Sequence, residues 1–264
     1  MSTTADRIAI NLLTTIDLNS IDNGRVFVEL ITSEFPFLCP DKFGNGEPLR
    51  TRYSPADKDA ILEAWQYRAF HWKKSRPFVD GGVMFAYGPH PRHSWLHISL
   101  SSRVAVSEVV RFVQRASVAY TADFATIHAM GSEEVDEILG DLKYGSKDPT
   151  VFFNNPRYGL HHNTVTSHNL QRFIPNLYWA TVLGPPYVEL FGKELLLGAP
   201  AFKTAELDEG RIYMQLSPDP MDFVANYPLQ NNARRIVREY LGHDAFLNYT
   251  LPLDHRYTVP TFRF

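Results

Sequence analysis

Hydrophobic residues recur along this chain with two different periods, one typical of helices and one typical of strands. Helical spacing predicts helices over residues 21–35, 107–120, 132–142, 187–196 and 229–241. Alternating or short apolar runs predict strands over residues 7–16, 82–87, 94–100, 124–128, 173–183, 201–207 and 211–216. Ser54-Pro55-Ala56-Asp57 adds a further helix start, because serine can cap a helix and proline suits its first position. The pattern predicts the α+β class.

The order of these elements repeats. Phe27-Val28-Glu29-Leu30 and Tyr187-Val188-Glu189-Leu190 each follow a glycine and a predicted strand. Trp95–Ser101 and Arg211–Ser217 are also alike, with apolar residues at matching positions. We therefore expect two similar β-α-β-β-α halves of antiparallel or mixed sheets packed with helices, with an insertion at about 36–80. Two unrelated halves with generic amphipathic patterns remain the alternative.

Length and composition fit this organisation. A chain of 264 residues with 44% hydrophobic residues can form one large domain or two smaller ones. We place a first half at 1–145, a connector at 146–168 and a second half at 169–264, which can also form one compact domain. Cys39 is the only cysteine, so a disulfide framework within the chain is excluded.

The start of the chain and its charge bear on location and partners. No apolar run marks a secretion signal, and no stretch approaches the roughly 20 apolar residues of a membrane helix, so we expect a soluble, cytoplasmic protein. The net charge is -3, and the basic runs Lys73-Lys74-Ser75-Arg76 and Arg234-Arg235 are short. We interpret both runs as solvated parts of helices and expect no nucleic-acid or membrane partner.

The sequence shows no recognisable active site. Glycine-rich phosphate loops and the Gly-x-Ser-x-Gly elbow are missing from the sequence. Two groups of histidines lack the spacing of metal ligands, so we expect a structural or surface role for both. The first group is His161, His162 and His168 in the connector, and the second is His90, His93 and His97, around the hairpin expected from the strands at 82–87 and 94–100. The sequence predicts a protein that is not an enzyme and holds neither a cofactor nor a metal ion.

Acidic residues form the most one-sided charged surface. The helix expected at 132–142 carries acidic residues on the face opposite its apolar stripe. A second acidic group lies near the turn between the strands expected at 201–207 and 211–216. A solvated helix face accounts for the first group, whereas a contact surface for a basic partner accounts for both. The candidate partner-binding residues are Glu133, Glu134, Asp136, Glu137, Asp141, Glu206, Asp208 and Glu209.

The segment from Phe173 to Gly192, which contains Asn176-Leu177-Tyr178-Trp179 and Gly184-Pro185-Pro186-Tyr187, resembles bacterial immunity proteins of the immunity protein 52 family. Arg256–Phe262 adds a weaker similarity, and agreement is best over 170–264. The resemblance implies an α+β protein that stays in the producing bacterium and neutralises a cognate toxin. It further implies a nuclease-type toxin delivered by type VI or contact-dependent secretion, and it carries over no catalytic residues.

The leading hypothesis is therefore an immunity protein that blocks a basic toxin cleft with acidic residues. One rival is a small-molecule hydrolase or transferase based on the region of His161, His162 and His168. Another is a scaffold module that dimerises through its repeated half. The sequence does not decide the identity of the toxin, the surface that binds it or the oligomeric state.

Overall fold

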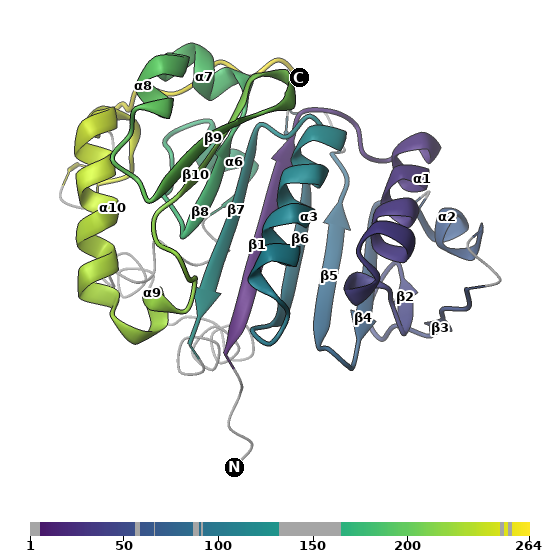
Figure 1. Ribbon diagram of the computed structural model, residues 1–264. Coiled ribbons are helices and arrows are strands. Elements are labelled where there is room, and N and C mark those ends of the chain that lie inside the picture. The colour runs from purple at the N-terminus through teal and green to yellow at the C-terminus, as the bar shows by residue number, and fades with distance from the viewer. Residues whose placement is uncertain are drawn as a thin grey trace.

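A computed structural model describes residues 6–55, 59–65, 67–86, 90, 92–131, 165–248, 251–252 and 255–264. Within these residues, ten strands form one antiparallel sheet in the order β3-β2-β4-β5-β6-β1-β7-β8-β10-β9 (Figure 1). The strands are β1 (Arg7–Thr14), β2 (Lys42–Gly44), β3 (Thr51–Arg52), β4 (Ala69–Lys74), β5 (Val79–Met84), β6 (Ser94–Ser101), β7 (Phe124–Met130), β8 (Ala180–Leu183), β9 (Lys203–Leu207) and β10 (Arg211–Gln215). The expected α+β class is confirmed.

Helices of different lengths pack on this sheet. In the described part of the chain they are α1 (Ile21–Glu29), α2 (Asp59–Trp65), α3 (Val106–Ala119), α6 (Ser167–Leu170), α7 (Pro185–Phe191), α8 (Lys193–Leu197), α9 (Asp222–Ala225) and α10 (Tyr227–Leu241), with a short π-helix at Leu30–Glu34. In the described ranges no helix is both long and apolar enough to cross a membrane.

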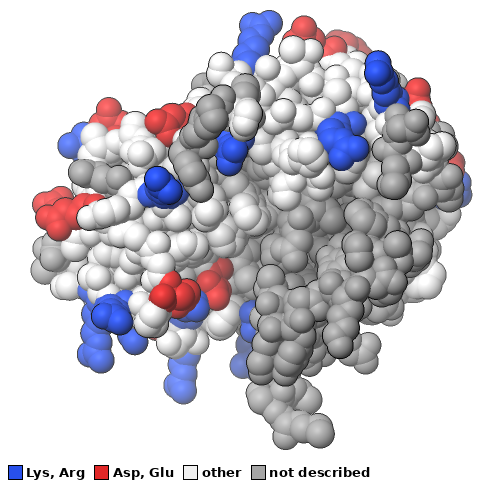
Figure 2. Space-filling model, turned by 180° about the vertical axis from the view of Figure 1, so that it is seen from behind, with Lys and Arg blue, Asp and Glu red and all other residues white. Residues whose placement is uncertain are grey.

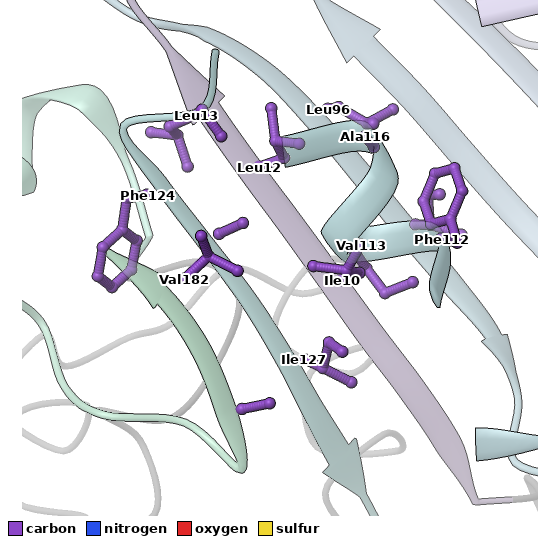
Figure 3. Close-up of a cluster of buried hydrophobic side chains, with 14 of the residues drawn as sticks. Ile10, Leu12, Leu13, Leu96, Phe112, Val113, Ala116, Phe124, Ile127 and Val182 are labelled. Carbon is purple, nitrogen blue, oxygen red and sulfur yellow. The ribbon is translucent and has the colours of Figure 1, made fainter. Parts of the chain in front are cut away.

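Strand β1 and helix α3 form the centre of the core. Ile10 and Leu12 of β1 point toward Val113 and Ala116 of α3, and Leu96 of β6 lies beside them (Figure 3). All five side chains are buried, as the alternating pattern of β6 and the helical spacing of α3 require. The same continuous core includes buried residues of β8 and β10, so one core extends from the N-terminal strands to the strands after residue 180.

The segment between residues 36 and 80 extends the sheet. It contributes β2, β3, α2 and β4, and an aromatic cluster fixes it to α1: the ring of Phe27 lies 4.8 Å from that of Trp65 and 5.0 Å from that of Trp72. The expectation that Lys73-Lys74-Ser75-Arg76 is a solvated part of a helix is wrong. Lys73 and Lys74 end β4, and Ser75 and Arg76 begin the turn to β5, because Phe70 and Trp72 alternate inward as in a half-buried strand.

The second half differs in detail from the sequence prediction. Only Ala180–Leu183 is a strand in the expected span 173–183, and the residues before it run irregularly through the core. The expected helix at 187–196 is divided into α7 and α8 at Gly192, whose φ of 85° lies in the left-handed region. The hairpin of β9 and β10 and the stop of α10 at Gly242 agree with the prediction.

Two groups of three strands pair in the same order. Strand β1 pairs with β6, and β6 pairs with β5. Strand β8 pairs with β10, and β10 pairs with β9. Strand β7 pairs with both β1 and β8 and so joins these two groups into one sheet.

Candidate functional site

A pocket of about 310 Å³ opens where several strands end. The C-terminus lies at the same end of these strands (Figure 1). Its walls come from the end of β1, the α3–β7 loop, the start of α7, the start of β10 and the C-terminal tail. The lining residues are Thr15, Thr121, Asp123, Pro185, Pro186, Glu189, Arg211, Thr261 and Arg263. This volume lies at the lower end of the range for small-molecule sites, about 300–1,000 Å³.

Two backbone features shape the pocket. Thr121 has a φ of 44°, which is unusual for a β-branched residue and concentrates strain in the α3–β7 loop. Gly184 lies so close to this loop that a Cβ atom there would be 2.3 Å from the carbonyl oxygen of Ala122. The Gly184 amide donates to the carbonyl of Asp123 at 2.9 Å, and this bond holds β8 against the loop.

Asp123 is the most buried carboxylate of the pocket, with 5% of the residue exposed. Burial raises the pKa of its carboxyl group, whereas hydrogen bonds from Thr15 and the positive charge of Arg211 act in the opposite direction. The backbone N–H of Thr15 donates to Oδ2 at 2.7 Å. Arg211 is itself buried, and its Nε donates to the carbonyl of Ala122 at 3.3 Å. The pocket thus contains two buried opposite charges.

His93 lies behind Asp123. Its Nε2 is 3.7 Å from Oδ2 of Asp123, which is too long for a hydrogen bond, and its Nδ1 is 2.9 Å from the hydroxyl of Ser167. The rings of Phe262 and Phe264 cover it, with centroids 4.5 and 5.1 Å from the imidazole. Burial lowers the pKa of His93 to about 4, so the ring is neutral at pH 7.

The Ser167 hydroxyl decides which nitrogen of His93 carries the proton. This hydroxyl accepts hydrogen bonds from the backbone N–H of His93 and from Nε2 of Gln171. Its single proton is therefore available to Nδ1 of His93, and the ring proton lies on Nε2, directed toward Asp123.

Tyr187 is a third buried polar group near Asp123. Its hydroxyl has no hydrogen-bond partner in the described part of the chain, and burial together with the charge of Asp123 raises its pKa well above the usual value. The Nε2 of His93 likewise finds no hydrogen-bond partner there. Buried donors without partners are uncommon, and two of them flank the carboxylate that lines the pocket.

Ser167, His93 and Asp123 are the residue types of a nucleophilic triad, but their arrangement fits a structural tie better. Ser167 does not line the pocket, and its oxygen already accepts two N–H groups. The side chain of His93 is fully buried beneath the C-terminal tail. A serine nucleophile needs an approach path for the substrate that this packing does not offer.

The other histidines behave differently from one another. His161 and His162 lie outside the described residues, and His168 is an exposed residue of α6 whose Nε2 is 3.4 Å from Nη1 of Arg172. His97 lies within β6, whereas His93 precedes it. In the described ranges, no group of three or more histidine, cysteine or acidic residues could hold a metal ion.

The candidate acidic residues are only partly described. Glu133, Glu134, Asp136, Glu137 and Asp141 lie outside the described residues. Glu206 and Asp208 are exposed at the end of β9 and in the turn after it, and Glu206 forms an ion pair of 2.6 Å with Lys193. Glu209 belongs to the same turn, but its side chain is not described. Neither Glu206 nor Asp208 lines the pocket.

The two segments that carry the family resemblance meet at this pocket. Pro185 and Pro186 belong to the first segment, and Thr261 belongs to the tail segment. The ring of Phe262 lies 6.0 Å from that of Tyr187. Sequence reasoning missed Asp123 and Arg211, because one precedes a strand, the other begins a strand, and neither has a neighbouring motif.

Comparisons with known proteins do not extend this picture. No model of a known protein family matches the chain. No curated protein matches it either.

Proposed function

We propose that this chain is a bacterial immunity protein that binds a toxic effector protein in the cytoplasm and neutralises it by contact. The resemblance of Phe173–Gly192 to the immunity protein 52 family suggests this function. The expected toxin is a nuclease-type effector of a type VI or contact-dependent secretion system, and inhibition requires no chemistry by this chain.

The open edge of the sheet at β9 is the observation that carries the proposal. In the described part of the chain, β9 pairs only with β10, so its outer backbone groups face away from the sheet. Phe202, directly before β9, is 58% exposed, and Glu206 and Asp208 are exposed at the other end. An edge strand can pair with a segment of another protein, and exposed aromatic residues commonly anchor such contacts.

Charge supports a protein partner over a nucleic acid. On the part of the face that Figure 2 colours by charge, Lys and Arg are scattered singly or in small groups, with Asp and Glu among them. A polyphosphate ligand favours cations collected on one surface, whereas the acidic end of β9 complements the basic cleft of a nuclease. Acidic residues at such a cleft accelerate association and fix the orientation of the complex.

We also propose that the two halves are degenerate repeats. Phe27–Leu30 falls at the end of α1 and the start of the π-helix, and Tyr187–Leu190 falls in α7, each following the first strand of its half. The second pair of similar segments covers β6 and β10, the middle strands of the two pairing orders. Leu96, Ile98 and Leu100 are buried, and so are their counterparts Ile212, Met214 and Leu216.

Co-expression with the protein encoded immediately upstream tests the function. We expect the upstream protein to arrest growth alone and to be tolerated when this chain is present. As a control, a co-expressed unrelated protein of similar size should give no protection. A neighbour that is harmless, or that stays toxic beside this chain, contradicts the proposal.

A further inference from the structure

We propose that the strand-end pocket binds a small zwitterion of the α-amino acid class, with its ammonium group on Asp123 and its carboxylate between Arg211 and Arg263. This inference is independent of the proposed immunity function, because the pocket shares no residue with the β9 edge. Four observations support it.

The first observation is the balance of charge. The pocket is lined by two carboxylates, Asp123 and Glu189, and by two guanidinium groups, Arg211 and Arg263. A phosphate-rich ligand would meet two carboxylates, and a simple cation would meet two guanidinium groups. A ligand with one charge of each sign can satisfy both kinds of group at once.

The second observation is burial. Asp123 and Arg211 are 5% and 2% exposed, so both charges at the base of the pocket are largely shielded from water. Arg263 and Glu189 lie exposed at the rim. Buried charges at the base and exposed charges at the rim orient a zwitterion, because the strongest interaction forms where water is excluded.

The third observation is the incomplete hydrogen bonding behind Asp123. In the described part of the chain, the carboxylate has hydrogen bonds only from Thr15, although its two oxygens can accept about four. The Nε2 of His93 and the hydroxyl of Tyr187 are buried donors without partners. An ammonium group in the pocket would donate hydrogen bonds to the carboxylate of Asp123. A small movement of His93 toward Asp123 would add a hydrogen bond from Nε2 on the opposite side.

The fourth observation is size and lining. The cavity of about 310 Å³ suits a ligand of amino-acid size and is small for a nucleotide. Thr15, Thr121 and Thr261 add hydroxyl groups, and Pro185 and Pro186 provide an apolar wall for a short side chain. The strained backbone at Thr121 is of the kind that persists at binding sites.

Isothermal titration calorimetry of the full chain with each proteinogenic L-amino acid, up to about 10 mM, tests the inference. We expect at least one to bind. Its analogue without the carboxylate and its analogue without the amine should each bind about tenfold more weakly or worse, because each lacks one of the two charged groups that the pocket would bind. Two analogues that bind as well as the amino acid would overturn the proposal.

Variants locate the binding. Asp123→Asn keeps an acceptor for the Thr15 N–H and should weaken binding about tenfold or more. Arg263→Ala changes only an exposed rim residue, so it tests the site even if Asp123→Asn folds poorly, and it should weaken binding several-fold. Glu63→Gln, an exposed residue of α2, is the matched control and should bind normally. Failure of every amino acid to bind, or binding unchanged in Arg263→Ala and in folded Asp123→Asn, rules out this site.

Discussion

At the scale of single residues, His93 is held neutral by its surroundings. Two phenylalanine rings exclude water from it, and the hydroxyl of Ser167 fixes its tautomer. In the unfolded chain the same histidine has an ordinary pKa near 6.5. Folding therefore disfavours protonation of the His93 ring, and the resulting loss of stability appears only at acidic pH.

The lowered pKa of His93 predicts how the stability of the protein depends on pH. Between pH 6.5 and about 4 the unfolded chain takes up a proton that the folded chain does not, so stability falls as the pH falls. The loss amounts to about 3 kcal/mol, at about 1.4 kcal/mol per pH unit. Urea unfolding across this range measures it.

His93→Asn is the variant that isolates this effect. The amide oxygen can accept the Ser167 proton in place of Nδ1, so the variant should be less stable at pH 7 but lose less stability in acid. Asp123 titrates in both proteins, and its raised pKa gives the opposite slope, so only the difference between them is informative. Equal losses in the two proteins contradict the assignment.

Gly184 gives a second residue-scale prediction. Because a Cβ there would meet the backbone of Ala122 and Asp123, Gly184→Ala should cost about 3 kcal/mol of unfolding free energy and distort the pocket. Gly46→Ala is the control, since a Cβ at Gly46 meets no atom within 4 Å, and its stability should change by less than about 0.5 kcal/mol. Thermal unfolding of both variants compares them, and similar melting temperatures would refute the close packing.

The pocket residues could not have been identified as a group from the sequence. Thr15, Asp123 and Arg211 come from three separate strand ends, and only the pairing of β1, β7, β8 and β10 brings them together. His93 was noticed in the sequence, but its burial depends on the C-terminal tail, more than 160 residues later.

At the scale of elements, periodicity predicted the long amphipathic segments well and the short ones less well. Helix α3 and strand β6 agree with the sequence within one residue, because each has one face on the core. The buried run 173–179 looked like a strand, but all seven residues are buried and their β-pairing is limited to an isolated bridge from Ile174 to Phe246, so the apolar character of the run reflected depth in the core. Gly192 divides a helix that apolar spacing alone had joined.

The β9 edge carries the element-scale prediction. If Phe202 anchors the toxin, Phe202→Ala should weaken the complex by about 2 kcal/mol, or about thirtyfold in Kd, with little change in stability because the ring is exposed. Tyr67→Ala, in an equally exposed aromatic residue outside this edge, is the control. Surface plasmon resonance measures both, and equal affinities for the two variants would exclude the β9 edge as the contact.

The acidic residues allow two competing surfaces to be separated. Asp208→Lys should slow association and reduce its dependence on salt if the β9 edge faces a basic cleft. Charge reversal of Glu133, Glu134 and Glu137 should have that effect if the segment 132–142 makes the contact. Association rates at low and high salt distinguish the two, and rates unchanged by either set reject acidic steering.

At the scale of the whole molecule, one sheet with a continuous core runs through the described part of the chain, and two groups of three strands within it pair in the same order. The sequence predicted two similar halves from paired segments, and this repeat stays a proposal. The position of β7 between β1 and β8 could not be predicted, because pairing between distant strands leaves no local pattern. The pocket lies at strand ends near the centre of this sheet, and the open edge of the sheet lies at β9. The proposed ligand site and the proposed protein contact therefore lie at separate places on the molecule.

Inhibition by contact is the central claim, and a titration tests it most directly. The purified upstream toxin is assayed for activity while this chain is added in increasing amounts. Stoichiometric binding predicts that activity falls in proportion to the chain added and ends at a fixed molar ratio. Full toxin activity at a large excess of this chain would contradict the account.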